Sequence, residues 1–273
     1  SNTTGNMNIG IGPGAMNNTV TGDNNIAIGP EAMDAVTSGT DNIGIGHETL
    51  TRLTTGASNI AMGNNALGQN AVTGNYNVAI GYFALGDDAG GNNNVAIGYA
   101  AGRDQIGVSG SVYIGENAGH TVSTGQQNIA IGKDAMYGGT TTGDNNIAIG
   151  ATTGDALTSG KDNVFIGKQA GIDVNSGHSN VLIGLQAGHD LTTGFHNVAI
   201  GSLTLDECTD VDYAVCIGFG AGSSINSSDS DSTVAIGNEA LLSMTNGQYN
   251  TAVGYAALKT NIDGDNNTAV GYQ

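Results

Sequence analysis

One short motif is repeated along the whole chain of 273 residues. Residues 21–33 read TGDNNIAIGPEAM, residues 142–150 read TGDNNIAIG, and residues 263–273 read DGDNNTAVGYQ. The copies follow one another in steps of 17 residues in twelve cases, 18 in two and 19 in one. Each of the sixteen copies ends at a closing glycine: Gly12, Gly29, Gly46, Gly63, Gly81, Gly98, Gly115, Gly132, Gly150, Gly167, Gly184, Gly201, Gly218, Gly237, Gly254 and Gly271. So strict a period predicts a solenoid, in which each repeat buries its apolar side chains by stacking on its neighbours.

Each repeat contains the pattern Asn, aliphatic, small, aliphatic, Gly, as in Asn25, Ile26, Ala27, Ile28 and Gly29. Alternation with a period of two predicts a strand that places both aliphatic side chains on one face and the Asn, the Ala and the Gly on the other. A small residue three positions after the closing glycine predicts a second short strand. A polar turn that contains glycine separates the two strands.

No helical periodicity is sustained, so the fold class is all β. We expect a β-solenoid, either a β-roll or a β-helix, of sixteen coils of about 17 residues each. Residues 1–273 are expected to form a single repeat array, cut from a longer chain, with one stretched turn at 202–233.

The Asn at the start of the strand recurs in most copies and predicts a column of stacked amides. Amide side chains stacked at the inter-strand spacing can hydrogen-bond to one another along the axis. The predicted ladder contains Asn25, Asn42, Asn59, Asn77, Asn94, Asn128, Asn146, Asn163, Asn180 and Asn197.

A coil of this size buries few aliphatic side chains for the number of residues it must order. We therefore expect several chains to associate side by side, with a monomeric solenoid as the alternative. Under this hypothesis the aliphatic residues lie inside each coil and the alanines form a smooth outer column for a second chain: Ala27, Ala61, Ala79, Ala96, Ala130, Ala148, Ala199 and Ala235.

Three segments carry a family resemblance: NVAIGYFAL at 77–85, TVAIGNEAL at 233–241 and NTAVGYAAL at 250–258. They resemble the repeats of phage tail fibres and related surface proteins that precede an endosialidase-type intramolecular chaperone. They are also similar to the shorter β-roll repeats in the heads of trimeric autotransporter adhesins. The resemblance implies a homotrimeric, extracellular, cell-surface or virion-borne fibre that acts as a structural shaft or adhesive body.

The charge balance limits the partners. Six basic residues against 24 acidic residues give a formal net charge of −18. Such a surface repels phosphate backbones and anionic lipids, so we expect no nucleic-acid partner. No apolar stretch approaches the length of a membrane span, and we expect no membrane insertion.

The stretched turn concentrates acidic side chains: Asp206, Glu207, Asp210, Asp212, Asp229 and Asp231. Grouped carboxylates can bind Ca²⁺ or act as acid and base, and the alternative is a solvated turn on an acidic fibre. Their spacing matches neither an EF-hand loop nor a calcium-binding nonapeptide repeat. We therefore expect no enzymatic activity and no cofactor, with calcium as the alternative.

Two pairs of histidines invite a metal interpretation. His120 and His189 share a phase of the repeat but are four coils apart, whereas His178 and His196 fall on adjacent coils and can meet. Two imidazoles without a third ligand make a weak site, so exposed turn histidines are the simpler interpretation.

The two cysteines also carry two interpretations. Cys216 occupies the small-residue position of a strand, and Cys208 lies eight residues earlier. They are predicted either as buried thiols or as an intra-repeat disulfide.

Aromatic residues directly after the closing glycine share one column: Tyr82, Tyr99, Phe219, Tyr255 and Tyr272. Under a first hypothesis these rings have a structural role and cover an edge of the fibre or a seam between chains. Under a second hypothesis they stack on sugars. The second hypothesis predicts host or cell-surface glycans as partners and makes the chain a lateral adhesin module.

Overall fold

The computed structural model describes residues 4–18, 20–70, 73–88, 90–225 and 232–273. The chain divides into two compact units, Ser1–Asp134 and Ala135–Gln273. Each unit is a parallel β-solenoid with one three-residue strand per coil, and the described residues contain strands and turns but no helix. The all-β solenoid predicted from the repeat is therefore confirmed.

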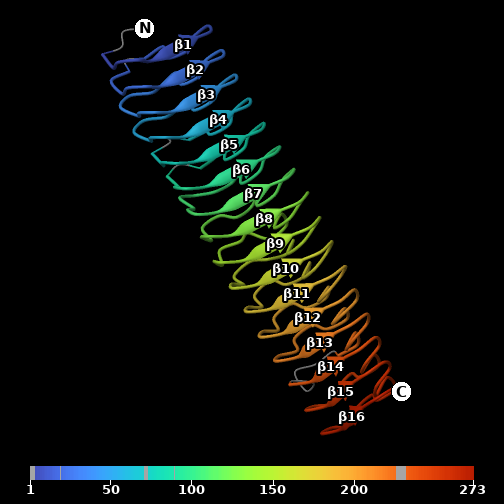
Figure 1. Cartoon of the computed structure of the whole chain (residues 1–273). Helices are drawn as coiled ribbons and strands as arrows, with labels where there is room; N and C mark the ends of the chain where they lie inside the picture. The colour runs from blue at the N-terminus through green and yellow to red at the C-terminus, as the bar shows by residue number, and fades with distance from the viewer. Residues whose placement is uncertain (1–3, 19, 71–72, 89, 226–231) are drawn as a thin grey trace. The chain divides into compact units, whose positions relative to one another are not determined.

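In the first unit, consecutive strands are hydrogen-bonded neighbours, and Figure 1 shows them stacked in chain order. Pairing is parallel and in register with the repeat, so that Val78, Ala79 and Ile80 lie opposite Val95, Ala96 and Ile97. The strands are β1 (Ile9–Ile11), β2 (Ile26–Ile28), β3 (Ile43–Ile45), β4 (Ile60–Met62), β5 (Val78–Ile80), β6 (Val95–Ile97), β7 (Val112–Ile114) and β8 (Ile129–Ile131).

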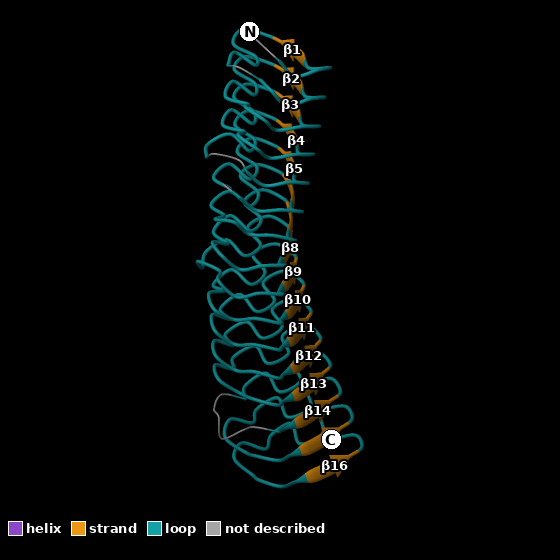
Figure 2. Ribbon diagram, turned by 90° about the vertical axis from the view of Figure 1, so that its left-hand side faces the viewer, coloured by secondary structure: helices purple, strands orange, loops and turns teal. Residues whose placement is uncertain are grey.

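The second unit repeats the same arrangement. Val164, Phe165 and Ile166 lie opposite Val181, Leu182 and Ile183. Its strands are β9 (Ile147–Ile149), β10 (Val164–Ile166), β11 (Val181–Ile183), β12 (Val198–Ile200), β13 (Val215–Ile217), β14 (Val234–Ile236), β15 (Thr251–Val253) and β16 (Thr268–Val270). In each unit the strands line one side of the coils and turns form the remainder (Figure 2).

The second short strand predicted after the closing glycine is wrong, because that segment is a turn. Glu31 and Met33, two and four residues after Gly29, have φ values of 53° and 52°. Left-handed residues at alternate positions cannot belong to an extended strand. The turn still bonds to the next coil, since the Met33 N–H donates to the Thr49 carbonyl at 2.9 Å.

The closing glycine permits the coils to stack. Gly29 has a φ of +134°, and a Cβ placed there would lie 2.4 Å from the carbonyl oxygen of Gly46 in the next coil. Only glycine combines this backbone conformation with this close approach. The repeat therefore needs glycine here for backbone and steric reasons together.

The predicted assignment of the two strand faces is inverted. Ala27 is 0% exposed and points into the coil, whereas Ile28 is 36% exposed and points out. The reason is the Asn, which shares a face with the Ala. The Asn25 amide donates to the Gly39 carbonyl of the next coil at 2.8 Å, and Asn25 is 0% exposed, so the Asn face is the inner one. The alanine column is therefore interior and cannot receive a second chain.

Candidate functional site

The asparagines of the predicted ladder are buried in the coil interior. The Asn42 side chain accepts the backbone N–H of Asn59 at 2.9 Å and donates to the Asn25 side chain at 3.0 Å and the Gly56 carbonyl at 2.9 Å. The same contacts recur at Asn163, Asn180 and Asn197 in the second unit. With their polar groups satisfied inside the protein, these side chains stabilise the stack and are not accessible to a ligand.

The outer side chains of the strands form what we term the aliphatic face of each unit. It consists of the first and third residues of every strand, all of which are Ile, Val or Met except Thr251 and Thr268. Ile97 and Ile200 are each 37% exposed, and Met62 is 39% exposed. No charged residue stands at these positions in any described strand. Each unit thus presents a continuous, uncharged apolar surface to solvent.

The aromatic column beside this face is exposed and stacked where two of its members follow each other. The rings of Tyr82 and Tyr99 lie 5.4 Å apart at 10°, and those of Tyr255 and Tyr272 lie 5.2 Å apart at 9°. Tyr99 is 55% exposed. Flat rings stacked at the inter-coil spacing form a surface able to receive another flat apolar group.

A second aromatic group was not predicted as a unit. His178 stacks on Phe195 at 5.0 Å, and His196 stacks on Tyr213 at 5.3 Å. The repeat contained a signal for this group, because Phe195 and Tyr213 lie on consecutive coils at repeat positions that differ by only one residue. His178 and His196 do meet, at 5.5 Å between ring centroids. Both histidines contact aromatic rings, and His178 also contacts the Ser179 hydroxyl, which does not favour a metal site.

The histidines that share a phase of the repeat each contact a carboxylate of their own unit. His120 Nδ1 lies 3.4 Å from Asp104 in the first unit, and His189 Nδ1 lies 2.5 Å from Asp190 in the second. Burial lowers the pKa of His120, and the nearby Asp104 opposes this effect. Each histidine is therefore part of a local charged group rather than of a histidine pair.

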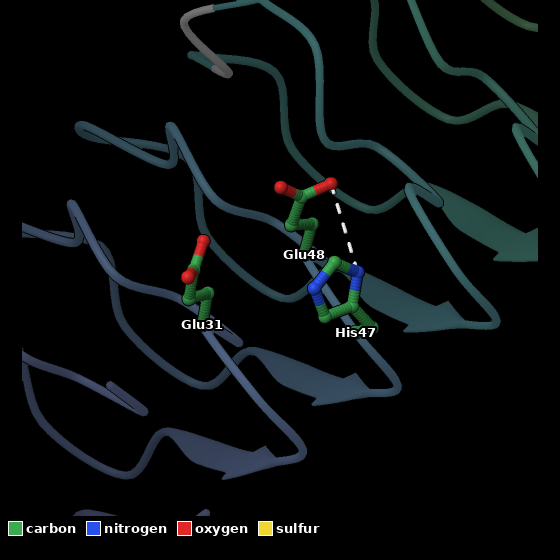
Figure 3. A group of neighbouring side chains, drawn as sticks. All are labelled: Glu31, His47 and Glu48. Carbon is green, nitrogen blue, oxygen red and sulfur yellow. Dashed lines mark ion pairs between the residues drawn. The ribbon is translucent and has the colours of Figure 1, made fainter. Parts of the chain in front are cut away.

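In two groups of three side chains among the described residues, potential metal-ligand atoms lie within 4.8 Å of one another. One consists of Glu31, His47 and Glu48, which project from neighbouring coils in Figure 3. His47 Nδ1 lies 3.7 Å from a Glu48 oxygen, and Glu31 and His47 are exposed. The other consists of Asp173, His189 and Asp190. Neither group was predicted, although the repeat contains the signal: the two acids of each group are 17 residues apart, and a histidine directly precedes the second acid.

The acidic residues of the stretched turn do not act as one group in the structure. Asp206 and Glu207 stand beside the His189 group, whereas Asp212 accepts the backbone N–H of Phe195 at 2.9 Å. Asp229 and Asp231 lie outside the described residues.

Both cysteines are free and buried, so the disulfide interpretation of Cys208 and Cys216 is not realised in the structure. Each occupies an interior position: Cys216 replaces the inner alanine of β13, and the Cys208 thiol lies 3.6 Å from the Gly222 carbonyl. Burial raises the pKa of Cys216 to about 12 and that of Cys208 well above its ordinary value. Thiols held in this state are poor nucleophiles.

Among the described residues, no helix is long and apolar enough to cross a membrane. Comparison with known proteins adds no name to this geometry: no family model matches the chain, and no curated protein matches it.

Proposed function

We propose that this chain is a structural shaft of an extracellular, cell-surface or virion-borne fibre, built by side-by-side association of copies of the chain through the aliphatic face. The observation that carries the proposal is the row of half-buried and exposed Ile, Val and Met side chains on successive strands. Soluble monomers rarely expose a contiguous apolar patch of several hundred Å² without an interaction at that patch. The role is mechanical, with repeat number setting reach.

The size of the face suits an interface. With about 4.8 Å between strands and about 3.3 Å per residue, the eight strands of one unit cover roughly 38 Å by 10 Å. Flat projection understates the accessible area, because the side chains protrude. In flat projection, the face of one unit supplies about half of the roughly 800 Å² per partner that stable complexes bury.

The occupant that fits best is a second copy of the chain. Its side chains recur at the same axial spacing, so that every ridge on one face meets a groove on the other along the whole stack. A partner without this period would match the face over one or two coils only. The number three comes from the resemblance to trimeric fibre repeats, and the face supplies the surface on which three copies meet.

Sedimentation of the purified chain tests this proposal, with three times the chain mass as the expected result. Ile97→Lys, between Ile80 and Ile114 on the aliphatic face, would bury a charge in every copy of the interface and weaken association by more than about tenfold. Ile106→Lys is the matched control, because Ile106 is 69% exposed but lies outside the strands. A well-folded monomer at all concentrations would overturn the proposal.

A second candidate function, lateral binding of glycans, is favoured by the stacked tyrosines. The apolar faces of sugar rings pack on exposed aromatic rings, and Tyr82 and Tyr99 present two such rings in parallel. A glycan array should show signals that the double variant Tyr82→Ala, Tyr99→Ala loses. Tyr76→Ala is the control, since Tyr76 is 64% exposed but stands in a different column. An array without signals leaves the shaft role and removes the adhesin role.

A further inference from the structure

The fifth and sixth residues after each closing glycine form a corner of the coil, and charged residues gather at this corner in the second unit. Asp173, His189 and Asp190 each place one ligand atom there, and the three atoms lie within 4.8 Å of one another. The His189 imidazole is hydrogen-bonded to Asp190 at 2.5 Å between Nδ1 and Oδ1. His189 and Asp190 are half-buried, and Asp173 is exposed.

The next coil adds two more carboxylates to the same corner. Asp190 donates its backbone N–H to the Asp206 carbonyl at 2.9 Å, which places Asp206 and Glu207 directly beside His189 and Asp190. Asp206 Oδ1 is buried and has no hydrogen-bond partner within the described part of the chain. A buried acceptor without a donor, among three further carboxylates, is a costly arrangement unless a cation faces it.

The first unit shows how the same corner is neutralised within the protein. There Asp87 and Asp104 occupy the places of Asp173 and Asp190, and Arg103 occupies the place of His189. The Arg103 Nε lies 3.7 Å from each of the two carboxylates. The backbone contacts are equivalent: Asp87 donates to the Arg103 carbonyl at 2.9 Å, and Asp173 to the His189 carbonyl at 3.2 Å. The residue between the acids differs, a permanent cation in the first unit and an imidazole in the second. The following coil differs too, because His120, 3.4 Å from Asp104, stands where the second unit has the acidic Asp206.

We propose that Asp173, His189 and Asp190, assisted by Asp206, bind a divalent first-row transition metal of the Zn²⁺ type. Imidazole together with carboxylates suits zinc, whereas calcium takes oxygen ligands alone. Ligands about 2.1 Å from a tetrahedral ion lie roughly 3.4 Å apart, so atoms already within 4.8 Å need only small side-chain rotations to close on it. The ion takes the place that the guanidinium of Arg103 holds in the first unit.

The group of Glu31, His47 and Glu48 serves as an internal comparison. It also consists of two carboxylates and one imidazole, but it lacks a buried unpartnered oxygen and two of its members are exposed. We therefore assign the ion to the corner of the second unit.

Titration of Zn²⁺ into the full chain, without a polyhistidine tag and after removal of metals, tests the assignment by calorimetry. One site per chain is expected, together with a melting temperature that rises with zinc concentration. His189→Arg reproduces the arrangement at Arg103, so this variant should fold, resist heat without zinc at least as well as the parent, and lose the site. Asp190→Asn should weaken binding by more than about tenfold.

His47→Gln is the matched control and should leave affinity and stoichiometry unchanged. Retention of the site in His189→Arg, or its loss in His47→Gln, would overturn the assignment. The assignment would also be overturned if calcium competed with zinc at equal concentration and bound both the parent and His189→Arg. If His189→Arg fails to fold, the assignment is tested by the metal affinity of Asp190→Asn and by the visible absorption of Co²⁺ bound in place of zinc.

Discussion

Each unit accommodates one large aromatic side chain at an inner strand position that holds alanine in most coils, and the two interiors differ in polarity. Tyr113 in β7 and Phe165 in β10 are both 0% exposed. Around Phe165 the interior is apolar, with Leu157, Val174 and Leu182. Around Tyr113 it contains the buried polar residues Asp88 and Gln105.

The polar interior of the first unit is incompletely satisfied. Both polar atoms of the Gln105 side chain, the Tyr113 hydroxyl and Asp88 Oδ2 are buried without a hydrogen-bond partner in the described residues. Each such group costs about 1 to 3 kcal/mol relative to a satisfied or apolar replacement. The comparison teaches that the period fixes where a side chain lies, whereas the residue at that place sets local stability. We expect the second unit to owe more of its stability to its aromatic residue than the first.

Removal of the aromatic rings should have the largest effect. Phe165→Ala should lower the free energy of unfolding by about 3 to 5 kcal/mol, because it leaves a cavity lined by apolar groups. Tyr113→Ala should cost less, since it also removes an unpartnered buried hydroxyl. Urea denaturation of the two variants measures the difference. Equal losses would contradict the proposed contrast between the two interiors.

The glycines that face these rings should come next. A Cβ at Gly119 would lie 2.0 Å from a ring carbon of Tyr113, and a Cβ at Gly171 would lie 3.0 Å from the Phe165 ring. Overpacking typically costs about 1 to 3 kcal/mol, so we expect Gly119→Ala at or above this range and Gly171→Ala near its lower end. Thermal unfolding compares the two.

The control for this prediction restores the combination found in other coils. Ala61 in the strand is followed by Leu67 in the facing position, where the coil of Tyr113 has Gly119. The double variant Tyr113→Ala, Gly119→Leu should therefore be more stable than Tyr113→Ala alone. If the losses of stability from the two single substitutions simply add in the double variant, the side chains at the two positions do not occupy one shared space in the interior.

This exchange of volume shows what the sequence could predict and what it could not. The 17-residue period was enough to predict the coils and their register, because residues one repeat apart must stack. The period of two within the strand gave the residues that share a face, but not which face is inner. Two signals could have decided it: buried Asn amides need backbone partners, and Gly119 and Gly171 occur where Tyr113 and Phe165 replace alanine.

The charged corner was predictable from the same period but was missed. Asp173, Asp190 and Glu207 are spaced by 17 residues, so they stand in one column. His189 precedes Asp190 in the chain and thus had to lie beside that column. Its hydrogen bond to Asp190 and the burial of Asp206 Oδ1 depend on side-chain conformations, which the repeat does not specify.

A smaller effect, of opposite sign, is expected at Gln105. Its column holds apolar residues in other coils, including Leu157 in the second unit. Gln105→Leu removes two unpartnered buried atoms and should raise the free energy of unfolding by about 1 to 2 kcal/mol. Leu157→Gln is the reciprocal variant and should be destabilising. A stabilising Leu157→Gln would show that the interior of the second unit tolerates polar groups equally.

The smallest effect should come from Asp88 and should depend on pH. Asp88 Oδ1 accepts the backbone N–H groups of Gly91 at 3.1 Å and Gly90 at 3.3 Å, whereas Oδ2 is buried without a partner. Burial raises the pKa of Asp88 above 3.8, with the backbone hydrogen bonds opposing the shift. The folded state therefore binds this proton more tightly than the unfolded state does. Its contribution to stability falls as pH rises through the folded pKa and is recovered on acidification.

Asp88→Asn removes this titration while keeping an oxygen for Gly91. Relative to the parent, the variant should gain most at neutral pH, and its advantage should shrink as pH approaches the ordinary Asp range. Melting temperatures of both proteins between pH 4 and pH 7 measure this difference. Asp87 and Asp206, whose pKa values burial also raises, titrate in both proteins and cancel in the comparison. A difference between parent and variant that does not vary with pH would mean that the Asp88 carboxyl titrates alike in the folded and unfolded chain. The polar interior of the first unit would then carry no electrostatic cost at this position.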